Sequence, residues 1–325
     1  MLTIYTQSQT DIHAVAINAD NKEQLKHALW IDLLSPTELE ENIIEQYLKL
    51  EIPTKNEMDE IEPSSRLYAE DDVLFMTTNM VAQSDDPEPK SDAVTFILTK
   101  NMLITVRYIE PLSFNLFINQ LKRAKIKNTN ALHLLVGILE TTTDRLADIL
   151  EKVSLKFDQI SHTVFRSNEH NTGNEVNYKN LLQAIGSNGI LGTKIRDSLV
   201  SFIRLISFLE QKHAATFDHE IKSRIAVMNK DIHALSDYAI FISSEVNFLL
   251  DATLGMINIE QNNIIKIFSV AAVIFLPPTL IASIYGMNFK HIPELSWLAG
   301  YPFSLSMMVI SAWLPYQYFR KKKWL

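Results

Sequence analysis

The stretch "IFSVAAVIFLPPTLIASI", residues 267–284, contains no charged side chain. A helix needs about 18 to 20 apolar residues to cross the hydrocarbon core of a bilayer, so this run is long enough to span a membrane. A second charge-free run extends from Leu295 to Phe319 and ends in a basic cluster at residues 320–323. Two such runs in succession favour two transmembrane helices over two core helices of a soluble protein. By the positive-inside rule, the basic cluster places the C-terminus in the cytoplasm, and two crossings place the N-terminal part there too.

The charge of the chain divides at the same place. Residues 1–263 hold 24 basic and 37 acidic side chains, whereas residues 264–325 hold 6 basic and 1 acidic. The acidic excess argues against a nucleic-acid partner, because phosphate binding needs basic side chains, and it suits cations. The absence of cysteine excludes disulfides and thiolate metal sites. Residues 1–20 lack the apolar core of a signal peptide.

The first 110 residues have the pattern of a mixed α/β domain. Ser35-Pro36-Thr37-Glu38 is interpreted as a capping box with proline at the first helical position, and a helix should follow to about Leu50. The last two predicted strands form a hairpin across Thr99-Lys100-Asn101. Strands are predicted at Leu2–Tyr5, Ala14–Ile17, Ala28–Leu33, Val73–Thr77, Ala93–Leu98 and Leu103–Tyr108.

Residues 111–221 have the pattern of a helical hairpin region. Apolar side chains recur every three or four residues from Leu132 to Val164, which predicts a long amphipathic helix, and a polar break follows at 168–177. Gly192-Thr193-Lys194 lacks the first glycine and the Gly-Lys-Ser/Thr order of a phosphate loop. Gly186, Gly189 and Gly192 instead indicate close helix packing. Because the sequence also contains no His-Glu-x-x-His motif and no nucleophile elbow, we expect no enzymatic activity.

A single helix is predicted to continue from the soluble part into the membrane. Between Lys222 and Ile284 the only glycine is Gly255 and the only prolines are Pro277 and Pro278, so a helix over this span would be about 90 to 100 Å long. The expected division is therefore a cytoplasmic α/β domain (1–110), the helical hairpin region (111–221), a stalk helix that becomes the first transmembrane helix (222–285), a short extracytoplasmic loop (286–298), the second transmembrane helix (299–319) and a basic cytoplasmic tail (320–325).

Polar and small side chains recur along one face of this helix in steps of three and four residues. Hydroxyl groups at Ser269, Thr279 and Ser283 fall on this face within the apolar run, where exposure to lipid would gain nothing. The face either lines a water-filled pore or simply meets solvent. Because two helices cannot enclose a pore, the first interpretation requires several copies of the chain. The stripe comprises Asp251, Gly255, Asn258, Asn262, Ile265, Ser269, Ala272, Leu276, Thr279 and Ser283.

Several motifs around the membrane segments carry a family resemblance. They are Tyr285-Gly286-Met287-Asn288, Ile292-Pro293-Glu294-Leu295, Gly300-Tyr301-Pro302 and the terminal Lys-Lys-Lys-Trp-Leu. Together they resemble the CorA family of magnesium transporters, and "NIEQNNIIKIFSVAAVIFLPPTLIASIYGMNF", residues 258–289, is similar to its proteobacterial members.

The resemblance implies a homopentameric channel in the bacterial inner membrane, with a funnel-shaped cytoplasmic domain and stalk helices around the pore. It further implies passive uptake of Mg²⁺ driven by the membrane potential, with Co²⁺ and Ni²⁺ as compatible secondary substrates and no organic cofactor. Gly286, Met287 and Asn288 would form the selectivity filter at the outer mouth, where Asn288 contributes a ring of amide oxygens. Asp251, Asn262, Leu276 and Thr279 match positions that line the pore in the family.

The chemistry of the proposed path suits a hydrated ion. Mg²⁺ holds its waters tightly, and neutral amide oxygens can accept hydrogen bonds from those waters without stripping them. Residues 261–293 contain no carboxylate that would trap a divalent ion, while Glu294 can attract cations to the mouth or is merely an interfacial charge. Apolar positions such as Ile265 and Leu276 can close a pore by dewetting.

The resemblance also implies closure by cytoplasmic Mg²⁺ bound between neighbouring subunits. Met58-Asp59-Glu60-Ile61 resembles the sensor segment, although the family often has the Glu-Asp order, and Asp231 is the expected partner on the stalk. Two alternatives remain at this point. A zinc transporter of the same superfamily would use His291 at the mouth, because zinc favours imidazole ligands. A membrane-anchored scaffold would carry no ion at all.

Overall fold

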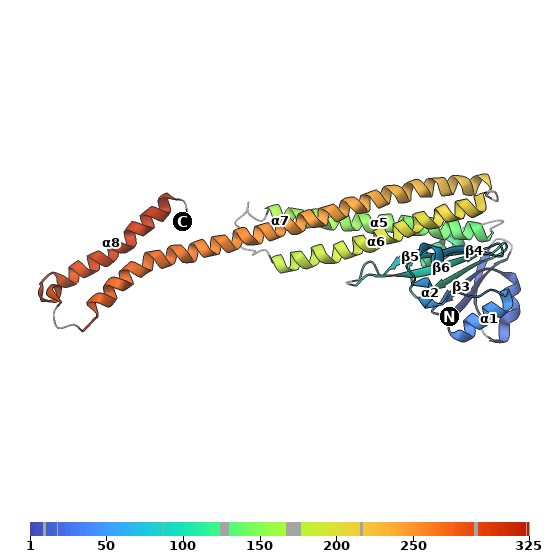
Figure 1. Cartoon of the computed structure of the whole chain (residues 1–325), viewed down its shortest axis with the longest axis horizontal. Helices are drawn as coiled ribbons and strands as arrows, with labels where there is room; N and C mark the ends of the chain where they lie inside the picture. The colour runs from blue at the N-terminus through green and yellow to red at the C-terminus, as the bar shows by residue number, and fades with distance from the viewer. Residues whose placement is uncertain are drawn as a thin grey trace. The chain divides into compact units, whose positions relative to one another are not determined.

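The computed structural model describes residues 1–8, 11–17, 19–86, 88–123, 130–166, 177–214, 217–288, 292–322 and 324. The chain divides into two compact units, Met1–Leu250 and Asp251–Leu325. The first unit contains a seven-stranded sheet with helices, and the second contains helices (Figure 1).

The sheet of the first unit has the strand order β2-β1-β3-β7-β6-β5-β4. The pair β3–β7 is parallel and the other pairs are antiparallel, including the predicted β6–β7 hairpin, whose turn is closed by a 3.0 Å bond from the Thr99 N–H to the Met102 carbonyl. The six predicted strands are confirmed, and β4 was not predicted. The strands are β1 (Leu2–Ser8), β2 (Asp11–Ala16), β3 (Ala28–Leu34), β4 (Leu67–Glu70), β5 (Val73–Ala82), β6 (Lys90–Leu98) and β7 (Leu103–Arg107).

Helices cover both faces of the sheet (Figure 1). On one face, Ile44 of α1 (Glu38–Leu48) and Met58 of α2 (Lys55–Met58) join a buried cluster with alternate strand residues such as Ile31 and Ile104. On the other face, the Trp30 ring lies 6.1 Å from that of Phe114 in α4 (Leu112–Arg123). The remaining short elements are η1 (Ala19–His27) and α3 (Pro63–Arg66).

The start of α1 differs from the prediction by two residues. Thr37 is the N-cap, and it forms a reciprocal capping box with Glu40, so the capping box predicted at Ser35–Glu38 is wrong. Pro36 therefore precedes the cap instead of occupying the first helical turn. Ser35 has a positive φ of 43°, a turn conformation in which it cannot serve as an extended N-cap residue.

A buried ion pair lies inside the first unit. Arg107 Nε and one terminal nitrogen donate to the two Asp32 carboxylate oxygens at 3.0 and 2.8 Å, and both residues are buried. Thr105 Oγ1 donates to Asp32 at 2.7 Å and accepts from Trp30 Nε1 at 3.0 Å. The carboxylate thus accepts three hydrogen bonds, two of them from its charged partner, and a buried charge requires such compensation.

Three long helices complete the first unit. The predicted amphipathic helix is α5 (Ala131–Arg166), and the next long helix is α6 (Tyr178–His213). Residues 168–176, which make up most of the predicted polar break, lie outside the described residues. A Cβ atom built on Gly189 would lie 3.1 Å from Val246, and one on Gly192 would lie 3.6 Å from Ile242, both on α7 (His219–Tyr285). The predicted close packing is confirmed at Gly189, whereas a Cβ atom on Gly192 would make an ordinary contact and Gly186 has nothing within 4 Å.

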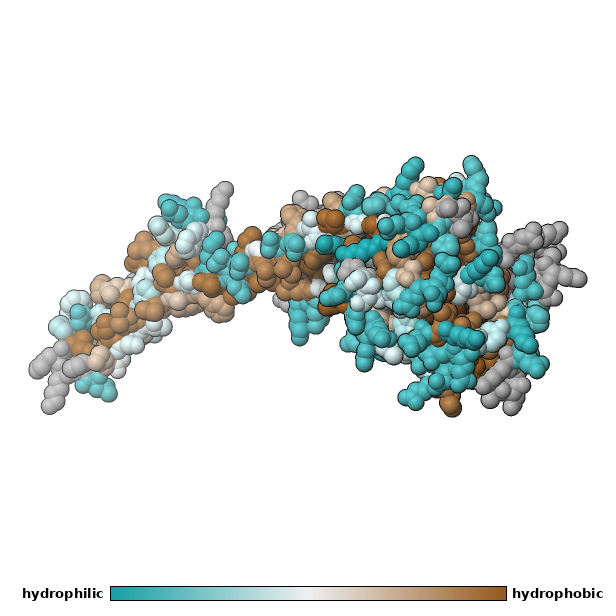
Figure 2. Space-filling view, turned by 45° about the vertical axis from the view of Figure 1, so that its right-hand side comes forward, coloured by the Kyte–Doolittle hydropathy of each residue, from teal (hydrophilic) through white to brown (hydrophobic). Residues whose placement is uncertain are grey.

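The second unit holds the remainder of α7, the short 3-10 helix η3 (Pro293–Ser296) and α8 (Gly300–Lys321). As predicted, α7 is one uninterrupted helix, and it continues through Pro277 and Pro278. Its apolar part passes the length and hydropathy criteria for a membrane span, and among the described helices it is the one that does so. Figure 2 shows brown, hydrophobic side chains over much of this unit, whereas teal side chains cover most of the surface of the first unit.

Candidate functional site

The stripe on α7 is exposed along almost its whole length. Leu276 is 64% exposed and Ile265 is 60% exposed, and Asp251, Asn258, Asn262, Ser269, Ala272, Thr279 and Ser283 are exposed as well. Gly255 alone is half-buried. The side chains that the sequence grouped on one face therefore form a continuous accessible face of the second unit.

The opposite face of α7 packs within the unit. Val270 is buried, and Ile274, Pro277, Ile281 and Tyr285 are half-buried. At about 100° per residue, this set lies on the other side of α7 from the stripe. Pro277 and Pro278 are both half-buried, so the proline pair lies toward the side of α7 that packs within the unit.

The complementary burial pattern occurs on α8. Apart from Gly300 at its start and Gln317, its less exposed positions are Ser304, Met308, Ser311, Ala312, Pro315 and Phe319, a helical spacing that indicates antiparallel packing against the buried face of α7. The C-terminal end agrees, because the Trp324 ring lies 5.5 Å from that of Phe319 and 5.9 Å from Lys266 Nζ on α7. Consequently α8 occupies one side of α7 and leaves the stripe uncovered.

The Gly-Met-Asn motif forms the turn that ends α7. Gly286 N–H bonds to the Ala282 carbonyl at 2.9 Å and Met287 N–H to the Ile284 carbonyl at 3.3 Å, so the chain leaves the helix at Asn288, which is exposed. Near the end of α7, Thr279 Oγ1 donates to the Leu276 carbonyl at 2.9 Å.

The described part of the segment after the turn, which begins at Ile292, contains the short 3-10 helix η3. Glu294 lies in η3, and its carbonyl accepts the Trp297 N–H at 3.2 Å. A Cβ atom on Gly300 would collide with the Glu294 carbonyl, which explains the glycine at the start of α8. His291, the expected ligand of the zinc alternative, lies outside the described residues.

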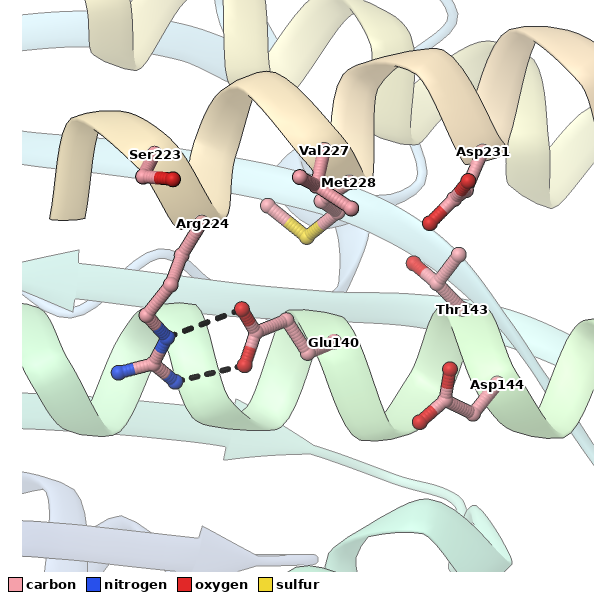
Figure 3. A pocket seen from close by; sticks show the side chains of 8 residues that line it. All are labelled: Glu140, Thr143, Asp144, Ser223, Arg224, Val227, Met228 and Asp231. Carbon is pink, nitrogen blue, oxygen red and sulfur yellow. Dashed lines mark hydrogen bonds and ion pairs between the residues drawn. The ribbon is translucent and has the colours of Figure 1, made fainter. Parts of the chain in front are cut away.

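A second candidate site is a pocket of about 330 Å³ between α5 and α7 in the first unit (Figure 3). Arg224 of α7 donates to both Glu140 oxygens of α5, at 3.0 and 2.6 Å, and so neutralises Glu140 at one end. At the other end, Figure 3 shows Asp231 of α7 and Asp144 of α5 on either side of Thr143.

The two aspartates make this end of the pocket electronegative. Asp144 is exposed as a residue, but partial burial of its carboxyl raises the pKa of that group, and the nearby carboxylates of Glu140, Asp148 and Asp231 raise the pKa further. Mutual repulsion of this kind is relieved by a bound cation. Sequence reasoning found Asp231 but missed Asp144. The spacing Glu140, Asp144, Asp148 marks one acidic face of α5, but the sequence does not show that this face lies beside α7.

The other expected sensor residues do not line this pocket. Asp59 and Glu60 lie in the segment between α2 and α3, where both are exposed. Within the described residues, no group of three or more His, Asp or Glu side chains of one chain is placed to hold a metal ion. Asp59 and Glu60 therefore do not share a site with Asp231 within the described part of a single chain.

Comparison with known proteins decides the family. A family model described as CorA-like Mg²⁺ transporter protein matches residues 26–321. The magnesium transport protein CorA of Wolinella succinogenes is 35% identical over 330 residues, which cover 100% of both chains. The chain belongs to the CorA family. The CorA protein of Escherichia coli K12 is 33% identical over 95% of this chain and 96% of its own length.

Solved structures agree with this CorA fold. The complete CorA magnesium transporter of Methanocaldococcus jannaschii matches with a TM-score of 0.75 at 18% identity, and the match covers 100% of this chain and 99% of that one. The full-length CmaX protein matches with a TM-score of 0.65 at 13% identity over 100% and 98% of the two chains. At these identities the likeness concerns the fold, an α/β part followed by long helices.

Proposed function

We propose that the protein is a homopentameric channel for passive uptake of divalent cations, chiefly hydrated Mg²⁺, with Co²⁺ and Ni²⁺ as secondary substrates. Residues 1–110 and 111–221 form its cytoplasmic part, 222–285 the stalk and first transmembrane helix, 286–298 the outer loop, 299–319 the second transmembrane helix and 320–325 the cytoplasmic tail. The channel lies in the bacterial inner membrane, and the membrane potential drives the ion inward. Family membership, through relatives named magnesium transport protein, supports the choice of ion.

The observation that carries the proposal is the exposed stripe on the side of α7 away from α8. In lipid, hydroxyl groups gain nothing from exposure, so the face that bears Ser269, Thr279 and Ser283 is stabilised where it meets water. Asn258 and Asn262 continue the same face on the part of α7 that precedes the charge-free run. Five such faces around one axis enclose a path, while the second helix of each chain faces lipid. Leu276 and Ile265 narrow this path with apolar side chains and act as the gate.

Selection for Mg²⁺ follows from the weak ligands along the path. Gly286 and Met287 form the turn that brings Asn288 to the outer mouth, where its amide oxygens accept hydrogen bonds from the water shell of the ion. Glu294 raises the local cation concentration beside the mouth. Because residues 261–293 contain no carboxylate, a divalent ion that enters can also leave.

Regulation uses the acidic cytoplasmic surface. Asp59 and Glu60 of one subunit meet Asp231 of its neighbour, and Asp144 shares the pocket of Asp231. Mg²⁺ bound there neutralises the carboxylates and holds neighbouring stalks in the closed state. When cytoplasmic Mg²⁺ falls, the carboxylates repel one another and the stalks separate.

The test is Mg²⁺ uptake into proteoliposomes by the purified protein under an applied membrane potential. We expect uptake that hexammine cobalt blocks, since this complex resembles the hydrated ion in size. Asn288→Ala should abolish uptake and leave the oligomer intact by size-exclusion chromatography, whereas Asn263→Ala, an exposed α7 residue off the stripe, should conduct normally. Normal flux in Asn288→Ala would remove the selectivity argument, and no flux of any metal would favour the scaffold.

A further inference from the structure

The segment between α2 and α3 is attached to the rest of the first unit by hydrogen bonds on both sides, although its carboxylates are exposed. On its N-terminal side, Thr54 and Glu57 form a reciprocal capping box, and the Met58 side chain is 1% exposed within the core of the sheet. The Asp59 N–H bonds to the Lys55 carbonyl at 3.1 Å. The position of Asp59 is thus fixed by α2.

Arg66 fixes the other side of the same segment. Its Nε donates to the backbone carbonyl of Glu60, and a terminal nitrogen donates to Asn79 Oδ1 on β5 at 3.0 Å. The Arg66 side chain is half-buried, and its bond to Asn79 is partly shielded from water, whereas its bond to the Glu60 carbonyl is exposed. One guanidinium group therefore ties the backbone of Glu60 to the sheet.

Asn79 is itself bonded to α6 through its backbone. The partner strand β4 pairs with β5 only from Val73 to Met76. Beyond that point two serines of α6 take over: Ser201 Oγ accepts the Asn79 N–H at 3.0 Å, and Ser198 Oγ donates to the Asn79 carbonyl at 2.7 Å. Hydrogen bonds thus run from the Glu60 backbone on one face of the sheet to α6 on the other.

We propose that Arg66 is a positioning residue for the regulatory carboxylates, and that Asn79 is the point where it is anchored to the sheet and to α6. This inference rests on the proposed function, in which Asp59 and Glu60 bind regulatory Mg²⁺ across a subunit boundary. Carboxylates that bind a metal must be held close to their productive geometry, and loss of a supporting hydrogen bond costs roughly 10- to 100-fold in metal affinity. Arg66 itself carries no ligand atom for a cation.

The experiment measures closure of the full-length channel by Mg²⁺ on the cytoplasmic face, in vesicles of one orientation. Asn79→Ala removes the side-chain acceptor without changing the charge beside the carboxylates, and Arg66→Lys keeps the positive charge but cannot bridge two partners. We expect both variants to need about tenfold more Mg²⁺ for half-closure, at unchanged flux in low Mg²⁺. Matched controls are Asn119→Ala and Arg204→Lys, two exposed helical residues of the first unit.

Thermal unfolding of each variant separates positioning from folding. If Asn79→Ala shifts half-closure while its unfolding midpoint stays with that of the controls, the inference holds. If Asp59→Asn and Glu60→Gln shift half-closure but Asn79→Ala and Arg66→Lys do not, Arg66 has no positioning role, although the regulatory proposal stands. If Asp59→Asn and Glu60→Gln are also without effect, the regulatory proposal itself fails.

Discussion

A matched pair of cysteine variants tests which face of α7 meets the ion path. The chain contains no cysteine, so Leu276→Cys and Val270→Cys each introduce a single thiol into an unreactive background. Leu276 is 64% exposed and Val270 is 2% exposed, a ratio of about thirty. The two positions lie about 120° apart around the helix axis, one on the stripe and the other on the face that packs with α8. We therefore expect a water-soluble, positively charged methanethiosulfonate reagent to modify the thiol of Leu276→Cys at least about tenfold faster than that of Val270→Cys.

The readout is Mg²⁺ flux in proteoliposomes before and after the reagent, in low cytoplasmic Mg²⁺. Modification at Leu276→Cys places one positive charge per subunit in the path and should stop the flux by repelling the divalent ion. Val270→Cys and the unmodified protein should conduct as before. Equal block of both variants, or continued flux after complete labelling of Leu276→Cys by mass spectrometry, would refute the assignment of the stripe to a pore.

Three further predictions concern the first unit, and each is measured on the full-length protein by thermal unfolding. Asp32→Ala leaves its buried arginine partner uncompensated and should destabilise by about 3 to 5 kcal/mol; a change within error would show that water reaches the pair. Gly186→Ala should stabilise the protein by up to about 1 kcal/mol, because it replaces a helical glycine that has open space around it. Gly189→Leu should destabilise the protein by about 1 to 3 kcal/mol, because the larger side chain would force α6 away from α7. The reverse order of stabilities would contradict the packing of α6 against α7. The pKa of Asp144 is raised in the folded protein, so protonation of this carboxyl favours the folded state, and this contribution to stability is lost as pH rises through the raised pKa. Bound Mg²⁺ would compensate the ionised carboxylate. Stabilisation by Mg²⁺ should therefore be largest at neutral pH and should shrink on acidification. Asp144→Asn should flatten this pH dependence, and a Mg²⁺ effect that grows on acidification would contradict it.

Much of the fold follows from local patterns. The charge-free run at residues 267–284, the 3.6-residue period of α5 and the alternation of the strands are each set by a strong local preference. The edge strand β4 was missed because it is short and half-exposed, and because it is followed by two turn residues, Asp71 and Asp72, with positive φ. The start of α1 was misplaced because both Ser35 and Thr37 are capping residues, and only the backbone conformation distinguishes them.

The residues of the candidate sites are less predictable from the sequence than the fold. The stripe on α7 could be predicted from spacing alone, because one helix fixes which side chains share a face. Asp144 could not, since its relation to Asp231 depends on how α5 and α7 pack. Arg66 and Asn79 carry no motif, and their link appears only when the backbone carbonyl of Glu60 is placed beside the sheet.

The central claim is that this chain conducts Mg²⁺ with its water shell through a path whose outer mouth and membrane segment carry uncharged oxygen groups. The most direct test is metal-resolved flux in proteoliposomes, with Mg²⁺, Co²⁺ and Zn²⁺ compared in the presence and absence of a pH gradient. We predict Mg²⁺ flux that follows the membrane potential, is indifferent to the pH gradient and exceeds the flux of Zn²⁺. Flux carried mainly by Zn²⁺, or Mg²⁺ flux that requires the pH gradient, would contradict the claim.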